Sequence, residues 1–439
     1  MLKIAALIAR HRHINWALAD QAVVSGSNFI TGILLARFLG PESFGVYVLL
    51  QTALVYVNSF QGALIFQPMM SAAPQMEEGE RSRYLQGVFA LQLILSFGLA
   101  GIAWLLGTTT HGVWGGEATS SLTPAVVLSL SCALLAFQLQ DWLRRYYFVL
   151  EMPRAAFIND VLNYGGQVAI LGAAYVSGHL DVVTAFWIMA GACFFTFLFG
   201  FVRGMVKPVF SDARAVLREG WRTGRDYLAA WQLQWAGSQG VLVVGAGMVG
   251  VHAAGGVRAA TNIVGPINIL FQAMENVVPV VAARRYDAKG LSGLSAYLYR
   301  VTLWGTALLL PMVAAAAIFA VPLMGFVYGE QYVVYAALVV WSAASVFLQF
   351  YLRVVFFFLR TVMATGIIVR TGVVMAVFSV SVAAFSVGAY QETGIMMALL
   401  SGVCAGLAYS AVAARKLASE LGSAPRPARV FDSVADSAR

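Results

Sequence analysis

Twelve apolar runs, each close to the length that crosses a lipid bilayer, constrain this chain more than any other feature. A transmembrane helix needs roughly 20 largely apolar residues. The runs cover residues 16–39, 44–66, 84–106, 122–143, 157–177, 181–202, 227–250, 257–281, 297–324, 331–352, 363–387 and 393–414. Only 11% of the 439 residues are charged, against about 25% in soluble domains. The sequence therefore predicts an all-α, polytopic membrane protein with twelve transmembrane helices, and it excludes a soluble enzyme, a nucleic-acid binder and a disordered chain.

The basic residues agree with this number of helices. If the N-terminus is cytoplasmic, all 28 lysines and arginines except Arg37 and Arg258 fall on the cytoplasmic side. Cytoplasmic loops of membrane proteins carry an excess of lysine and arginine. We therefore expect a multi-pass membrane protein with both termini in the cytoplasm.

The two halves of the chain match each other at a constant offset of 211 residues, which aligns Gln21 with Gln232 and Pro68 with Pro279. Each half has an even number of expected helices, so the repeats are parallel, related by an axis along the membrane normal. The sequence predicts an N-terminal six-helix lobe, a basic linker helix, a C-terminal six-helix lobe and a disordered cytoplasmic tail. Their boundaries are 1–202, 203–226, 227–417 and 418–439.

The linker has arginines at helical spacing beside an apolar edge. The arginines are Arg214, Arg218, Arg222 and Arg225, and the apolar edge is Ala213, Leu217 and Trp221. This pattern is typical of a helix that lies on the bilayer with its arginines among anionic lipids. A solvated linker that only fixes the topology explains the arginines equally well.

Polar residues gather in the first, second, seventh and eighth expected helices. They include Asn28 in the first, Gln61 in the second, Gln239 in the seventh, and Arg258, Asn262, Gln272 and Asn276 in the eighth. Polar groups within a membrane usually face a bundle interior or a water-filled cavity, although they also join helices directly. A continuous stripe on helices that the repeat relates favours a polar central cleft between the lobes.

Two further patterns bear on cofactor binding. Residues 245–250 match the dinucleotide fingerprint G-x-G-x-x-G, which requires a strand–turn–helix unit. Here the glycines lie inside an expected membrane helix, where close helix packing explains them better. The three cysteines, Cys132, Cys193 and Cys404, lie in separate apolar runs. We expect no disulfide, no metal and no cofactor.

Several segments resemble a known family. Residues 35–45, Leu-Ala-Arg-Phe-Leu-Gly-Pro-Glu-Ser-Phe-Gly, look like the first external loop of Wzx-type polysaccharide flippases of the MOP superfamily. The segment from Gly256 to Arg284 resembles the eighth helix of that family. The segment from Arg144 to Asn159, after the fourth expected helix, also resembles the family. The resemblance implies two six-helix lobes around a cleft lined by helices 1, 2, 7 and 8. It also implies a location in the bacterial inner membrane and movement of undecaprenyl-pyrophosphate-linked oligosaccharide from its inner to its outer leaflet.

Within this interpretation, Arg258 is the strongest candidate to bind the pyrophosphate, because a guanidinium suits bidentate hydrogen bonds to phosphate. An arginine that only reaches the outer interface is the alternative. The expected substrate-binding set is Arg258, Asn262, Gln272, Asn276, Asn28, Arg37 and Gln61. Asp20 and Glu275 are candidates to bind a coupling proton or sodium ion, or else they pair with Arg10, Arg284 or Arg285.

Two other functions fit parts of the pattern. A cation-coupled multidrug exporter of the same superfamily should have an acidic cavity instead of Arg258. A polysaccharide polymerase or ligase needs a large external catalytic loop, and residues 107–121 offer only His111 and Glu117. We therefore expect a transporter and not an enzyme, with lipid-linked oligosaccharide and anionic lipids as partners and polysaccharide polymerase machinery as a further candidate partner.

Overall fold

The computed structural model describes residues 12–110, 122–203 and 206–423, and these residues form helices without any strand. The first half contains α2 (Arg12–Gln61), η1 (Gly62–Phe66), α3 (Gln67–Ala72), η2 (Ala73–Gln75), α4 (Glu78–Thr110), α6 (Pro124–Val149), α7 (Pro153–Asp160), η3 (Val161–Gly165), α8 (Gly166–Val176) and α9 (Val182–Val202). The second half contains α10 (Phe210–Trp235), η4 (Ala236–Gly240), α11 (Val241–Val249), α12 (Val251–Ile263), α13 (Ile267–Ile318), α14 (Ala320–Tyr328), η5 (Glu330–Tyr335), α15 (Ala336–Thr361) and α16 (Thr365–Ser423).

Three of these helices are long enough to hold two expected transmembrane runs each. In α2, α13 and α16 the chain turns at Gly40 (φ 77°), Gly290 (φ 63°) and Gln391 (φ 50°). Seven helices of the described residues are long and apolar enough to cross a membrane, and all three of these helices are among them. The all-α, multi-pass membrane architecture is confirmed, whereas the number of twelve spans stays a prediction.

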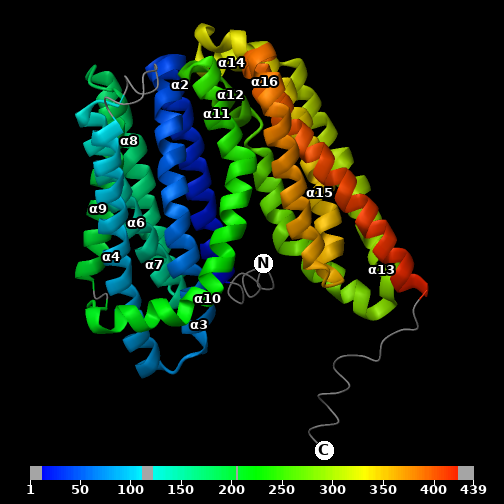
Figure 1. The fold of residues 1–439 in the computed structure, drawn as a ribbon, viewed down its shortest axis with the longest axis horizontal. Coiled ribbons are helices and arrows are strands. Elements are labelled where there is room, and N and C mark those ends of the chain that lie inside the picture. Colours follow the sequence, from blue (N-terminus) through cyan, green and yellow to red (C-terminus); the bar gives the residue numbers. More distant parts are fainter. Residues whose placement is uncertain (1–11, 111–121, 204–205, 424–439) are drawn as a thin grey trace, which may run out of the picture.

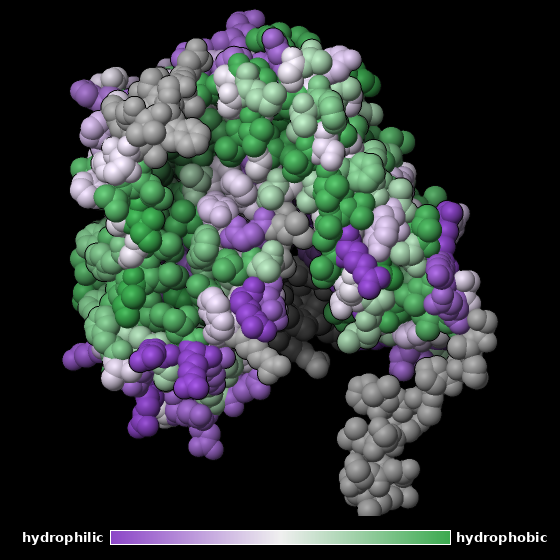
Figure 2. All heavy atoms as spheres, viewed as in Figure 1, coloured by the Kyte–Doolittle hydropathy of each residue, from purple (hydrophilic) through white to green (hydrophobic). Residues whose placement is uncertain are grey.

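The helices form two lobes that touch at one end of the molecule and separate toward the other (Figure 1). We call the end with α12 and α14 the closed end. We call the opposite end, with α3 and the start of α10, the basic end, because α10 exposes Arg214 and Arg218 there. Toward the basic end the surface is hollowed between the lobes, and hydrophobic residues cover much of their flanks (Figure 2).

Two glycines bring α2 and α12 into backbone contact at the closed end. A Cβ added to Gly45 would overlap the carbonyl oxygen of Val251, and one added to Gly255 would overlap that of Pro41. The Arg37 guanidinium adds a hydrogen bond across the lobes, donating to the carbonyl oxygen of Phe326 at 3.3 Å. The closed end is therefore shut by contacts that leave no room for larger side chains.

Replacing Gly45 with alanine should open this end. Overpacking costs about 1–3 kcal/mol, which shifts a two-state equilibrium roughly 5- to 150-fold. Spin labels at Val176 and Phe326, which are 84% and 83% exposed on opposite lobes, should then show a longer-distance population in a background without the native cysteines.

Gly26→Ala on the same helix is the matched control, because a Cβ there meets no atom within 4 Å. Identical distance distributions for the two alanine variants would contradict a role of Gly45 in holding the lobes together.

The linker helix α10 packs on the N-terminal lobe. Ala213 and Val216 are buried, while Arg214 and Arg218 are exposed. The contact with α4 selects this face, so the buried edge is Ala213 and Val216, whereas Trp221 of the expected edge is 48% exposed. The helix continues to Trp235, beyond the expected boundary at residue 226. At the other end of the chain, α16 reaches Ser423, and the rest of the expected tail lies outside the described residues.

Candidate functional site

A polar cavity of about 330 Å³ lies between the lobes, and helices of both lobes line it. Its polar lining residues are Asn28, Thr31, Tyr47, Gln51, Thr52, Tyr164, Gln167, Gln239, Arg258 and Asn262. The first two expected helices contribute five of these residues, all of them within α2. The seventh contributes Gln239 and the eighth contributes Arg258 and Asn262. The four helices selected by polarity therefore meet at one cavity.

Three members of the predicted binding set, Asn28, Arg258 and Asn262, lie together in this lining. Asn262 packs directly against α2, since a Cβ added to Gly32 would lie 2.9 Å from its Nδ2 atom. The sequence reasoning missed Tyr164 and Gln167 of the fifth expected helix. Both are polar residues inside the run 157–177, and counting them would have added this helix to the cleft.

Arg258 is the charged residue of the cavity lining. Among the described residues, no carboxylate lies within 4.0 Å of its guanidinium. Its side chain lines the space between the lobes. Arg258 is only partly exposed, and an unpaired guanidinium with restricted access to water is costly, so the cavity is suited to an anionic ligand.

Irregular helical segments shape the cavity. Tyr164 and Gln239 lie on the π-helical turns η3 and η4, and such turns are frequent at functional sites. The expected eighth helix is interrupted between Ile263 and Ile267. Pro266 has no N–H to donate and disfavours helical geometry in the residue before it, which explains the interruption.

This interruption separates the expected stripe of the eighth helix. Arg258 and Asn262 lie on α12, but Gln272, Glu275 and Asn276 lie on α13. Gln272 is exposed and is not among the cavity-lining residues, and the side chain of Asn276 lies outside the described part of the structure. One continuous polar face, as the helical periodicity suggested, does not form.

Two other predicted binding residues lie elsewhere. The Gln61 side chain is buried inside the N-terminal lobe, where its Nε2 donates to Gln92 Oε1 at 2.9 Å and to the carbonyl oxygen of Gln138 at 2.7 Å. Arg37 is exposed at the closed end, where it contacts Phe326. Gln61 thus holds helices of one lobe together, and Arg37 bridges the two lobes.

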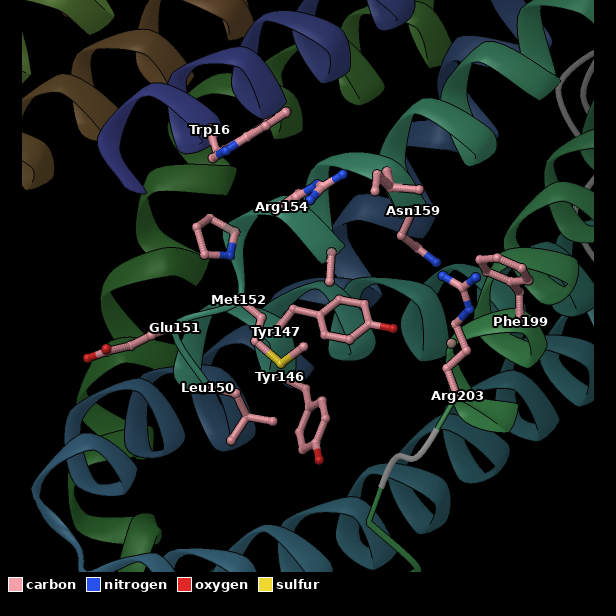
Figure 3. A pocket seen from close by; sticks show the side chains of 14 residues that line it. Trp16, Tyr146, Tyr147, Leu150, Glu151, Met152, Arg154, Asn159, Phe199 and Arg203 are labelled. Atoms are coloured by element: carbon pink, nitrogen blue, oxygen red, sulfur yellow. The ribbon is translucent and has the colours of Figure 1, made fainter. Parts of the chain in front are cut away.

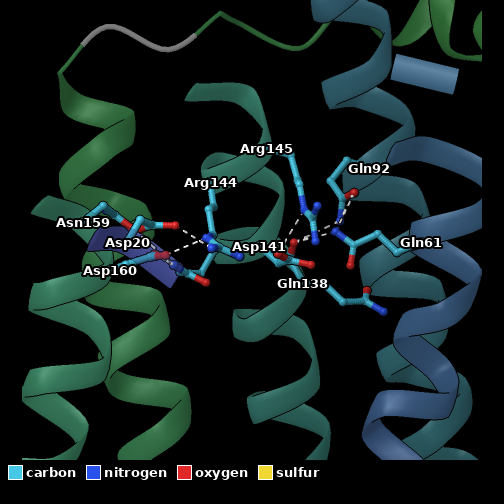
Figure 4. Close-up of polar contacts among 10 residues, drawn as sticks. Asp20, Gln61, Gln92, Gln138, Asp141, Arg144, Arg145, Asn159 and Asp160 are labelled. Atoms are coloured by element: carbon cyan, nitrogen blue, oxygen red, sulfur yellow. Dashed lines mark hydrogen bonds and ion pairs between the residues drawn. The ribbon is translucent and has the colours of Figure 1, made fainter. Parts of the chain in front are cut away.

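Asp20 belongs to a buried ionic cluster in the N-terminal lobe (Figure 4). The Arg144 guanidinium is 2.5 Å from Asp20 Oδ2 and 2.6 Å from Asp160 Oδ2, and Gln140 donates to Asp160 Oδ1 at 2.8 Å. Both carboxylates have 1% or less of their side-chain surface exposed. Arg144, expected in a cytoplasmic connection, lies inside α6. One cation between two buried carboxylates leaves one negative charge uncompensated, which favours uptake of a proton or another cation.

Glu275 has the opposite surroundings. Its carboxylate lies 3.2 Å from Arg353 Nη1 and 2.6 Å from Arg360 Nη1. These partners, both on α15, replace the expected Arg284 and Arg285, because the contact between α13 and α15 brings distant residues together. Arg10, the partner suggested for Asp20, lies outside the described residues. With two cations for one carboxylate, the Glu275 cluster is already compensated and partly exposed.

A family profile described as "Polysaccharide biosynthesis protein" matches residues 34–337. The chain belongs to this family. Among curated proteins, no significant match was found.

Solved structures of the MOP superfamily share the fold. An inward-facing multidrug resistance MATE family transporter has a TM-score of 0.74 and 15% identity, covering 92% of this chain and 96% of its own. An outward-facing structure of a MATE family transporter has a TM-score of 0.59 and 16% identity, with 93% and 95% covered. The lipid II flippase MurJ in an inward closed conformation has a TM-score of 0.68 and 9% identity, with 92% and 87% covered. The expected MOP-type fold is confirmed.

Proposed function

We propose that this member of the polysaccharide biosynthesis family flips undecaprenyl-pyrophosphate-linked oligosaccharide repeat units from the cytoplasmic to the outer leaflet. These units would serve exopolysaccharide, capsule or O-antigen synthesis. The observation that carries the proposal is the unpaired Arg258 guanidinium in a polar cavity between two lobes. Its planar fork matches the oxygens of a pyrophosphate. The amides of Asn28, Gln51 and Asn262 supply donors and acceptors for sugar hydroxyls.

The arrangement of the lobes supports alternating access from the basic end. The lobes are in contact at the closed end and hollowed between them toward the basic end, and the basic residues there support a cytoplasmic location for the basic end. The greater similarity to the inward-facing than to the outward-facing MATE structure is consistent with this state. In this proposal the headgroup enters from the cytoplasm while the isoprenoid chain stays in the lipid.

Energy for outward movement can come from two sources. Moving a negative charge outward across an inside-negative membrane gains about 2.3 kcal/mol per charge per 100 mV. The uncompensated charge of the Asp20–Asp160 pair supports a second source, a coupling proton or sodium ion. Glu275, which two arginines neutralise, is less suited to this role.

Reconstituted protein tests the proposed activity directly. Proteoliposomes that contain a fluorescent undecaprenyl-pyrophosphate glycan should lose more fluorescence to an impermeant reductant than protein-free vesicles, because flipping exposes the inner-leaflet label. Undecaprenyl-pyrophosphate without a sugar should compete, because Arg258 would bind its headgroup. Failure to flip the labelled lipid, together with export of cationic drugs, would support the multidrug exporter instead. The cavity lining argues against that outcome, since it contains no carboxylate among the described residues.

Replacing Asp20 with asparagine should uncouple transport without unfolding the protein. The variant leaves Arg144 paired with Asp160 alone, which balances the charge. Whichever gradient, of protons or of sodium, accelerates wild-type flipping should accelerate this variant at least several-fold less. Glu275→Gln is the matched control and should keep the dependence on the gradient. Equal dependence in both variants would contradict a coupling role for Asp20.

A further inference from the structure

A second, larger cavity lies at the basic end of the N-terminal lobe, separate from the cavity that contains Arg258. Its volume is about 560 Å³, and it is lined by the ends of four helices (Figure 3). Trp16 comes from the start of α2, Tyr147 from the end of α6, Arg154 from the start of α7, and Phe199 and Arg203 from the end of α9 and the residue after it. Nothing in the proposed transport cycle uses this pocket.

The charges of this pocket are unbalanced. Arg154 and Arg203 are exposed, and neither has a carboxylate within 4.0 Å among the described residues. The Arg203 guanidinium lies 4.3 Å from the centroid of the Phe199 ring, and a guanidinium above a ring face keeps its in-plane N–H donors free. Glu151 is the single carboxylate among the lining residues, and it points away from the two arginines in Figure 3. The pocket is therefore suited to an anion.

The remaining walls are mostly apolar. Leu150, Met152 and Ile158 line the pocket together with aromatic rings, and Met152 and Ile158 are 47% and 37% exposed. Just beside Arg203, Val202 is 77% exposed. Aromatic rings and arginines at helix ends are typical of the membrane–water interface. A ligand that fits both parts has an anionic head and an apolar chain.

We propose that this pocket binds the phosphate headgroup of an anionic phospholipid from the surrounding leaflet. Arg154 and Arg203 hold the phosphate, and the apolar wall contacts the adjoining acyl chain. Since the two arginines come from α7 and from the end of α9, the bound lipid joins these elements. Asn159 of the same pocket lies next to Asp160 in the chain, and its Nδ2 donates to the carbonyl oxygen of Thr196 in α9 at 2.9 Å. The lipid therefore stabilises the region around the Arg144 cluster.

Native mass spectrometry of the full chain, after graded delipidation in detergent, tests this assignment. Wild-type protein should retain phosphatidylglycerol in at least fivefold preference to phosphatidylcholine, and added phosphatidylglycerol should raise its thermal unfolding temperature. The double variant Arg154→Gln/Arg203→Gln should lose most of both effects. Both arginines are exposed, so the variant should fold, and its unfolding temperature without added lipid checks this.

Arg284→Gln/Arg285→Gln is the matched control, because it removes two exposed arginines of α13, away from this pocket. Its lipid preference should equal that of wild type. Equal losses in the two double variants would overturn the assignment, because the basic end would then attract lipids without a specific pocket. Displacement of phosphatidylglycerol by millimolar inorganic pyrophosphate, or by equimolar undecaprenyl-pyrophosphate, would also overturn it in favour of a soluble anion or of the transported lipid.

Discussion

Arg258→Ala should abolish most lipid flipping while the protein remains inserted at normal abundance. The variant removes the charged residue of the central cavity and, under the proposed function, at least one charge-assisted hydrogen bond to the pyrophosphate. Such a bond contributes about 1.5–3 kcal/mol, and each 1.4 kcal/mol corresponds to about tenfold in binding. We therefore expect at least a tenfold loss of the initial flipping rate, measured per unit of reconstituted protein.

Arg258→Lys separates charge from geometry. An ammonium keeps the positive charge but loses the bidentate fork, so this variant should recover only part of the rate. Arg37→Ala is the matched control, since Arg37 lies at the closed end, away from the cavity lining, and it should retain pyrophosphate competition with wild-type affinity. Near-normal flipping by the Arg258→Ala variant would remove Arg258 from the site.

The second large effect is on folding. Arg144→Ala should prevent most of the protein from accumulating in a folded form, because it leaves the carboxylates of Asp20 and Asp160 buried without their cation. Removing one partner of a buried ion pair typically costs about 3–5 kcal/mol. The yield of monodisperse protein on size-exclusion chromatography, relative to total expressed protein, measures the effect.

The adjacent arginine provides the control for this experiment. Arg145 has 38% of its side-chain surface exposed, against 13% for Arg144, and it pairs with Asp141 at 3.5 Å. Arg145→Ala should therefore lower the yield less than Arg144→Ala, since it leaves one carboxylate, Asp141, without its cation and not two. The triple variant Arg144→Ala/Asp20→Asn/Asp160→Asn should recover folded protein. Normal yield of Arg144→Ala alone would show that the cluster does not depend on this cation.

Much of the fold and part of the cavity follow from periodicity. Apolar runs of bilayer length predict the helices, and the concentration of polar residues on four of them predicts which helices meet. Asn28, Arg258 and Asn262 were found together for this reason. Each of these residues lies on the helix face that turns toward the other lobe, a property that a helical repeat of 3.6 residues makes visible in sequence.

The residue types alone could not show which groups each polar side chain contacts. Gln51 and Gln61 lie on the same helix, but at 100° per residue they are about 80° apart around its axis, so one lines the cavity and the other packs inside the lobe. Asp20 and Arg144 are 124 residues apart in sequence, and only the packing of the lobe brings them together. Asp160 could have been predicted as a functional candidate from the sequence, since it is a carboxylate inside an expected membrane helix, which is unusual and costly.

The path of α10 has a consequence for how the chain divides into moving parts. Gly220 lies against Pro68, Gly224 against Ala63 and Leu64, and the Trp231 ring against Gly62. The first part of the second repeat is thus clamped to the first lobe well beyond the point where the internal duplication begins again. The boundary between the two sequence repeats therefore does not coincide with the boundary between the two packed lobes. If the lobes rock as proposed, we expect the pivot to follow Trp235, at the π-helical turn η4, whose Gln239 also lines the central cavity.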